Sequence, residues 1–165
     1  MLHRFFLHAP AQAPRARSAL QNPPGAGTEA LVRSAPEEPA AAAVDAYFAS
    51  IRRRDYRAWE DSFTEAAVVH DPVGAAPAEG ADGRKEVWNV LTAPFSRLDI
   101  RPQRTFCGGN GAAVYWHAEA TGTNGGQASF EGISVFEFDA EGKIEALMSY
   151  WDPAAVMIAL AGERA

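Results

Sequence analysis

The segment His70-Asp71-Pro72-Val73-Gly74 marks the end of an apolar strand and places one carboxylate directly at that end. The β-branched pair Val68-Val69 just before it favours a strand. Pro72 cannot donate a hydrogen bond to a sheet, and Gly74 allows a tight turn. Asp71 is therefore expected at a strand terminus over a cavity, where a carboxylate can act as a base. The alternative is that Asp71 only caps the turn through its side chain.

Upstream of this turn, the sequence indicates two helices. Four apolar residues at the spacing i, i+3, i+4 and i+7 predict one stripe of a helix that begins within residues 40–43: Val44, Tyr47, Phe48 and Ile51. Three arginines, residues 52–54, follow at its end, where they complement the helix dipole; an anion site is the alternative. Asp55 is expected to cap a second, short helix with Tyr56, Trp59 and Phe63 on one face.

Downstream of the turn, Asp82 is expected to cap a third helix, which Pro94 brings to an end. From residue 98 on, the apolar pattern changes to a period of two. Four strands are predicted between turns rich in Gly, Asn and Asp: residues 101–107, 112–121, 128–138 and 143–151. Three helices followed by an antiparallel meander predict an α+β fold in which the sheet curls around the helices.

Composition bounds the organisation of the chain. At 165 residues, of which 47% are hydrophobic, the chain can build one core, so a single folded domain is predicted over residues 40–165. Residues 1–39 are rich in proline and alanine and contain no acid before Glu29, which predicts a disordered tail or leader. If these residues are a flexible tail or follow a mis-assigned start, the protein is expected to be cytoplasmic. The alternative is an organelle transit peptide, which would direct the protein to an organelle.

Charge and residue counts exclude several classes of function. The net charge of −6 and the absence of a basic stripe argue against nucleic acid as a partner. The single cysteine, Cys107, excludes an internal disulfide and is expected to be a small buried hydrophobe. The four histidines are not grouped at ligand spacing, so no metal site is predicted. No apolar run reaches the ~20 residues that span a membrane.

Alternation along the strands predicts which side chains face inward. On the second long strand, Trp116 belongs to the apolar set, whereas His117 and Glu119 point away from it and can pair. On the third long strand, Ser134 and Phe136 share one face, and the opposite face is also apolar in its middle. A sheet with helices on one side and apolar residues on both predicts a homodimer through the convex face.

Several segments together resemble the Δ5-3-ketosteroid isomerases. They are residues 44–51, 54–56, 71–74 and 77–80 in the front half, and residues 136–139, 142–144 and Trp151 in the back half. The spacing from Tyr47 to Asp71 and the Asp-Pro-Val-Gly turn carry most of the resemblance. The remainder is shared with the wider NTF2-like superfamily, which includes SnoaL-like polyketide cyclases, epoxide hydrolases, dehydratases and proteins without catalysis. The resemblance implies a cone in which the first helix and the concave sheet face enclose a pocket.

The same resemblance implies roles for individual residues. Asp71 matches the general base, Tyr47 the phenol that donates to the oxyanion, and Trp151 an aromatic residue of the pocket. Ser134 stands where the family has a protonated aspartic acid, so it supplies a weaker donor. With Trp116 and Phe136 as further walls, these residues predict a cofactor-independent isomerase or cyclase for a small hydrophobic carbonyl compound.

Two alternatives remain open at this point. One is a non-catalytic protein that binds a small apolar ligand or serves as a dimerisation module. The other is an epoxide hydrolase or dehydratase of the same fold, in which the carboxylate directs water or removes a proton from a different substrate.

Overall fold

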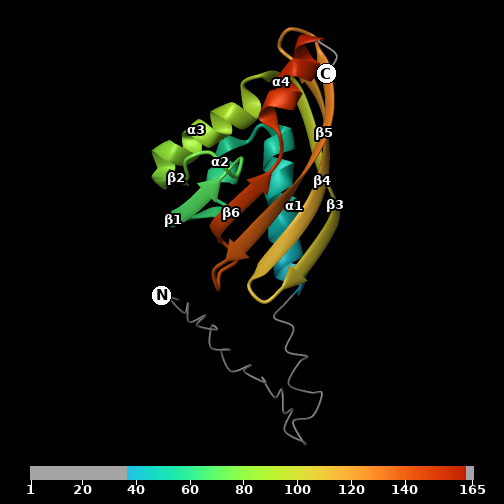
Figure 1. Ribbon diagram of the computed structural model, residues 1–165. Coiled ribbons are helices and arrows are strands. Elements are labelled where there is room, and N and C mark those ends of the chain that lie inside the picture. Colours follow the sequence, from blue (N-terminus) through green and yellow to red (C-terminus); the bar gives the residue numbers. More distant parts are fainter. Residues whose placement is uncertain (1–36, 163–165) are drawn as a thin grey trace, which may run out of the picture. The chain divides into compact units, whose positions relative to one another are not determined.

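The computed structural model describes residues 37–162, which form four helices and one six-stranded sheet (Figure 1). The helices are α1 (Glu37–Arg53), α2 (Tyr56–Glu60), α3 (Gly80–Thr92) and α4 (Pro153–Ala161). The strands are β1 (Phe63–His70), β2 (Ala78–Glu79), β3 (Phe95–Gly108), β4 (Gly111–Gly122), β5 (Gln127–Phe138) and β6 (Ile144–Tyr150). This mixed arrangement confirms the predicted α+β class.

The sheet combines the predicted meander with one non-local pairing. Its strand order is β2-β1-β6-β5-β4-β3, and every neighbouring pair is antiparallel except β1 and β6. These two strands run parallel, with Val68 opposite Ala146 and Val69 opposite Leu147. Because β1 lies beside β6, the end of β1 comes close to the end of β6, 80 residues further along the chain.

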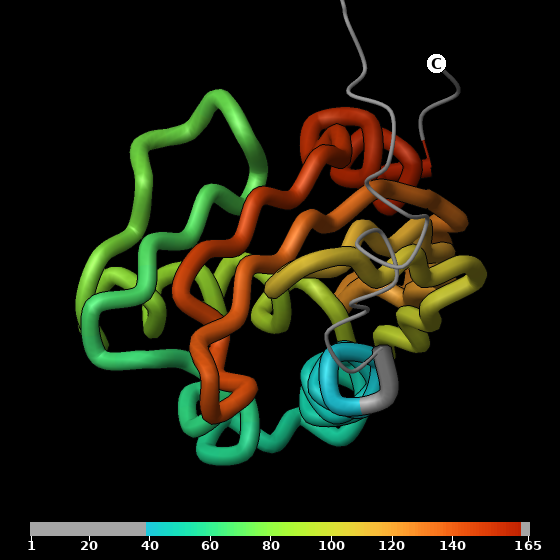
Figure 2. Tube along the Cα trace, turned by 90° about the horizontal axis from the view of Figure 1, so that it is seen from below, coloured from blue at the N-terminus to red at the C-terminus, as the bar shows by residue number. Residues whose placement is uncertain are grey.

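Helix α1 fills the concave side of the curved sheet. Its apolar stripe is almost fully buried, and no member of it is more than 2% exposed: Val44, Tyr47, Phe48 and Ile51. Figure 2 looks along α1 and shows the strands passing over one side of it. The predicted helix is thus confirmed, although it begins at Glu37 instead of within residues 40–43. The predicted tail lies outside the described residues as far as residue 36.

Several predicted boundaries were wrong. Phe63 opens β1 instead of sharing a helix face with Trp59, because α2 ends at Glu60. Glu79, not Asp82, is the residue before α3, and Asp82 lies in that helix's first turn. Strand β3 begins at Phe95, six residues before the predicted start. Helix α4 was not predicted; its first residue follows Asp152, whose side chain accepts from the Ala155 N–H.

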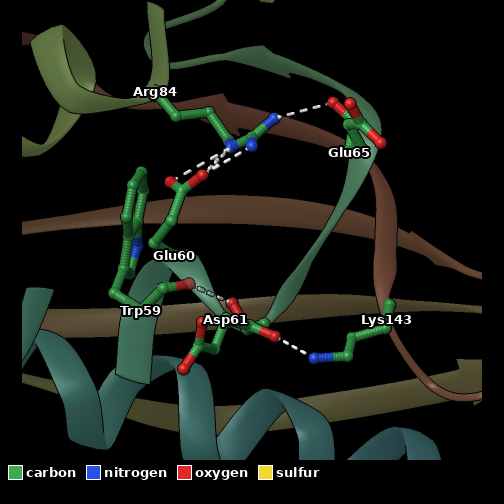
Figure 3. Close-up of polar contacts among 7 residues, drawn as sticks. Trp59, Glu60, Asp61, Glu65, Arg84 and Lys143 are labelled. Atoms are coloured by element: carbon green, nitrogen blue, oxygen red, sulfur yellow. Dashed lines mark hydrogen bonds and ion pairs between the residues drawn. The ribbon is translucent and has the colours of Figure 1, made fainter. Parts of the chain in front are cut away.

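A buried arginine joins the helices to the first strand (Figure 3). The Arg84 side chain, 5% exposed, pairs with Glu60 at 2.5 Å and donates to the Glu65 carbonyl at 3.3 Å. Its guanidinium also lies over the Phe63 ring. The Glu60 side chain is 21% exposed, so removing one partner should cost less than the ~3–5 kcal/mol of a fully buried pair. Arg84 therefore holds α3 against α2 and the start of β1, which fixes the strand that carries Asp71.

The outer face of the sheet differs from the inner one. Three cross-strand neighbours on β4, β5 and β6 are 37–50% exposed: Tyr115, Ile133 and Tyr150. His117 and Glu119 lie on the same face and approach to 3.5 Å, which confirms that they pair away from the pocket. Cys107 is half-buried against the core instead of fully buried. No helix between residues 37 and 162 is long and apolar enough to cross a membrane.

Candidate active site

One pocket lies between α1 and the concave face of the sheet, and we call it the inner pocket. Its walls are apolar except for four polar side chains: Tyr47, Asp71, Ser134 and Ser149. These residues come from α1, the turn after β1, strand β5 and strand β6. The fold thus gathers at one place polar groups that are up to about a hundred residues apart in the sequence.

Asp71 follows β1 directly and lines the inner pocket. The Trp151 indole N–H donates a hydrogen bond of 2.6 Å to its Oδ1 atom. Burial raises the pKa of Asp71 to about 6, while hydrogen bonds from Trp151 and Ser149 oppose that rise. The backbone of the turn is held too, since the Val73 N–H donates to the Ser149 carbonyl at 2.8 Å. Asp71 is therefore a fixed, half-buried carboxyl group whose pKa lies above its ordinary value.

A chain of hydrogen bonds leads from the second wall to Asp71. The Trp116 indole N–H donates to the Ser134 hydroxyl at 2.9 Å, and the Ser134 and Ser149 hydroxyls lie 2.9 Å apart. A serine hydroxyl has one proton. Because Ser149 donates to Asp71, Ser134 donates to Ser149 and accepts from Trp116. All donors in this chain point toward the carboxylate.

Gly132 explains how Trp116 reaches this position. The two residues are opposite each other on β4 and β5, and a Cβ atom on Gly132 would lie 2.3 Å from the Trp116 ring. The indole therefore lies over bare backbone. Only glycine leaves that space open without displacing the ring.

Tyr47 projects from α1 into the same pocket. Burial and the negative charge of Asp71 both raise the pKa of its phenol far above the ordinary value, so Tyr47 stays protonated at any physiological pH. Its ring is held edge-on by Phe48, Phe63 and Phe136, with centroids 5.2 to 6.2 Å away. Tyr47 is consequently a rigid, neutral hydrogen-bond donor near a carboxylate.

The structure differs from the sequence analysis for Phe136. This ring is fully buried and does not line the inner pocket. It packs against Tyr47 at 5.2 Å and against Phe48 at 6.2 Å. Phe136 therefore supports Tyr47 from behind instead of forming a wall of the pocket.

Ser149 and Phe130 are among the residues that line the pocket and were not predicted from the sequence. Phe130 stacks between Phe95 and Trp151, with centroid distances of 6.2 and 5.8 Å, and so forms a continuous aromatic wall. Alternation was the available signal, since residues 130, 132 and 134 share one face of β5, and residues 149 and 151 follow the same alternation at the end of β6. The pocket leaves only about 20 Å³ of space for a water-sized sphere. That is room for about one water molecule, so a larger ligand must displace part of the aromatic wall.

Among residues 37–162, no group of histidine, cysteine or acidic side chains is placed to hold a metal ion. The polar groups of the inner pocket are one carboxylate, one phenol and two hydroxyls, surrounded by aromatic and aliphatic side chains. Such an arrangement can exchange a proton with a bound molecule and donate a hydrogen bond to its oxygen.

Comparison with known proteins places this site in a family. The solved structures that are similar include SalBIII, an epoxide hydrolase/cyclase-like enzyme in pyran ring formation in polyether salinomycin. It is 29% identical, with a TM-score of 0.64 over 70% of this chain and 92% of that one. The Δ5-3-ketosteroid isomerase from Mycobacterium sp. is 25% identical, with a TM-score of 0.61 over 73% of this chain and 95% of that one.

A third similar structure, an epoxide hydrolase of M. tuberculosis described as LEH-like, is 20% identical. Its TM-score is 0.59 over 76% of this chain and 91% of that one, and it shows the fold alone. No curated protein sequence matches the chain. The model of the SnoaL-like domain matches residues 44–162, a range that contains every polar group of the inner pocket. The chain therefore belongs to the SnoaL-like domain family, within the NTF2-like superfamily.

Proposed function

We propose that this protein is a cofactor-independent acid–base enzyme that acts on a small hydrophobic carbonyl compound, as an isomerase or a cyclase. The observation that carries the proposal is that the inner pocket holds a half-buried carboxyl group, Asp71, together with a buried phenol, Tyr47. Asp71 has a pKa of about 6, and the neighbouring phenol of Tyr47 remains neutral. A base whose pKa lies near the working pH is the most effective in proton transfer from carbon.

The two groups divide the chemistry between them. At neutral pH, Asp71 is largely ionised and takes a proton from the carbon beside the carbonyl group. Tyr47 donates a hydrogen bond to the oxygen as negative charge develops there. Return of the proton to another carbon completes an isomerisation. In a cyclisation, the enolate carbon attacks a second carbonyl carbon, the π electrons of that carbonyl move to its oxygen, and this oxygen takes the proton from Asp71. Neither route needs a metal or an organic cofactor.

Ser134 has a different role in this proposal from that of the oxyanion donor, which its alignment with the isomerases suggests. To act as a second oxyanion donor, it would have to give up its hydrogen bond to Ser149. We assign it instead to the chain that orients Asp71, and Trp116 to the same chain. Trp151, which donates directly to Asp71, also forms part of the pocket wall.

The similar structures support enzymatic function in general. An isomerase and a cyclase-like enzyme are among those at 25% identity or more. The ring-forming enzyme is the more similar of these two by identity, which favours cyclisation or attack on an epoxide over steroid isomerisation. In an epoxide reaction, Asp71 would accept the proton of an attacking hydroxyl group or water.

The mostly apolar lining of the inner pocket favours one second candidate, a carrier of a small apolar ligand. In that case Asp71 would be a hydrogen-bond acceptor for the ligand and for the turn. We also propose that the exposed row of Tyr115, Ile133 and Tyr150 is covered by a second copy of the chain, since monomers rarely leave so contiguous an apolar face in water. Neither nucleic acid nor membrane is expected as a partner.

The enzyme proposal is tested by Asp71→Asn, with Asp45→Asn as a matched control on the exposed side of α1. Both proteins are assayed for isomerisation of a 3-keto-Δ5-steroid and for cyclisation of a hydroxy-epoxide, and for binding of 2-naphthol by fluorescence. We expect Asp71→Asn to lose turnover by a factor of about 10² to 10⁴, the ordinary contribution of a general base, while 2-naphthol still binds. Turnover at the wild-type rate in Asp71→Asn would rule out the base. Binding without turnover in the wild type would favour the carrier.

A further inference from the structure

A second polar region lies outside the inner pocket, where the end of α1 meets β3. A groove of about 410 Å³ runs there, and we call it the arginine groove. Five arginines line it: Arg52, Arg53, Arg54, Arg97 and Arg101. Asp99 is the one carboxylate among its lining residues. The chain as a whole carries a net charge of −6, so this concentration of positive charge opposes the overall balance.

Two of the arginines are fixed by neutral acceptors. Arg52 donates from Nη1 to the Ile100 carbonyl at 2.8 Å. Arg54 donates from Nη2 to the carbonyls of Thr92, at 3.2 Å, and of Phe95. A carbonyl orients a guanidinium without cancelling its charge, and each guanidinium has five N–H groups. These two side chains are therefore held in place, with donors left over.

The nearby negative charges do not balance the arginines. Asp99 pairs with Arg101 at 2.8 Å and lies 3.8 Å from Arg97. Glu119 is opposite Asp99 on β4, but its carboxylate accepts from Ser129 and pairs with His117. The end of the α1 dipole adds about half a negative charge. Five guanidinium groups against these groups leave the arginine groove clearly positive.

Arg53 is the exposed member with no charged or hydrogen-bonded partner among the described residues. It lies beside the two fixed arginines and opposite those of β3. A ligand that reached this place would meet one adaptable and several oriented guanidinium groups, which reduces the entropy lost on binding.

We propose that the arginine groove binds the phosphate or diphosphate group of a small molecule. Planar guanidinium groups donate pairs of parallel hydrogen bonds that match phosphate oxygens, and several of them in one groove suit more than one negative charge. Leu98 lines both this groove and the inner pocket, so the two lie next to each other. The phosphate site goes beyond the enzymatic function proposed above and does not depend on it.

The test uses inorganic pyrophosphate as the probe and the full chain as the protein. Isothermal titration at constant ionic strength compares the wild type with Arg53→Glu and with Arg53→Gln. Arg57→Glu on α2 is the matched control, because it makes the same charge change at an exposed residue outside the groove. Arg52 and Arg54 are left intact, since their bonds to backbone carbonyls hold the fold together.

We expect the wild type to bind pyrophosphate with a dissociation constant below about 1 mM, and Arg53→Glu to weaken it at least tenfold. Arg53→Gln should weaken it severalfold, and Arg57→Glu by less than twofold. Absence of binding by the folded wild type would overturn the proposal. Equal losses in Arg53→Glu and Arg57→Glu would overturn it as well, since they would show a response to net charge alone.

Discussion

The inner pocket and the arginine groove handle charge in opposite ways, although Leu98 belongs to both. In the inner pocket, one half-buried carboxyl group lies beside the Trp151 ring, and desolvation raises its pKa to about 6. In the arginine groove, charges of one sign gather at an open surface, where water and backbone carbonyls surround them. Desolvation thus raises the pKa of a single carboxyl group toward neutral pH, whereas exposure keeps several arginines charged at one surface, where they can bind the same anion. Changes in the two regions should therefore have different consequences for stability.

The largest effect on stability is expected at Asp71. Its pKa is about 3.8 in the unfolded chain and about 6 in the folded protein. The folded state therefore holds the proton longer, so stability falls as pH rises from about 4 to 6 and stays low above that. At pH 7 the shift corresponds to about 3 kcal/mol, and Asp71→Asn should recover much of it.

Urea unfolding of the wild type and Asp71→Asn at pH 4 and pH 7 provides the measurement for this first prediction. The variant should be the more stable protein at pH 7, and the difference should shrink toward pH 4. A difference that does not change with pH would mean that Asp71 is not desolvated in the folded protein.

A loss of stability, smaller than the gain expected for Asp71→Asn, is expected from Gly132→Ala, which tests how the pocket is packed. The new methyl group would overlap the Trp116 ring, so the indole must move away from Ser134. Overpacking of this kind costs about 1–3 kcal/mol. Thermal unfolding followed by Trp fluorescence reports both the loss of stability and the movement of the indole. Gly125→Ala cannot serve as the control, because Gly125 has a φ of 84°, which strains any other residue. Gly108→Ala is the control, since a Cβ atom there would meet open space. A wild-type melting temperature in Gly132→Ala would contradict the close packing of Trp116 over Gly132.

These contrasts also explain what the sequence could predict. The stripe on α1 and the turn after β1 are local patterns, because side-chain periodicity and turn residues act over a few positions. Asp71, Tyr47 and the three arginines after Ile51 could therefore be singled out in advance. Ser149 could not, because its place beside Asp71 depends on the parallel pairing of β1 with β6. That pairing joins segments about 80 residues apart, and no local pattern encodes it.

Phe63 and Phe136 show the same limit at the level of single residues. Phe63 continues the helical spacing of Tyr56 and Trp59, yet the chain leaves the helix at Asp61, whose carbonyl accepts from Lys143 near the start of β6. Phe136 has the alternation of an inward-facing residue, and it does face inward. Whether an inward ring meets the pocket or the core depends on α1, which covers it with Tyr47 and Phe48.

A change in rate without a large change in stability is expected from Ser149→Ala. Loss of this hydroxyl removes a hydrogen bond that favours the ionised form of Asp71, so the pKa of Asp71 should rise above about 6. The acid limb of the plot of kcat/KM against pH should move to higher pH, while the plateau at high pH changes little. Ser62→Ala, outside the pocket, is the control; an unmoved acid limb in Ser149→Ala would mean that the hydroxyl does not act on Asp71.

The smallest effect on stability is expected in the arginine groove, and it completes the contrast with the inner pocket. Arg53 is exposed on the last turn of α1 and has no partner among residues 37–162, so Arg53→Gln should change the free energy of unfolding by less than about 0.5 kcal/mol. Removing one of several like charges should also relieve some repulsion, so any small change should be a gain. Urea unfolding at low and high salt is the measurement, because salt screens exposed charges. If Arg53→Gln instead lost more than about 1 kcal/mol, Arg53 would be holding the end of α1 in place, and the arginine groove would be a structural joint instead of a free charged surface.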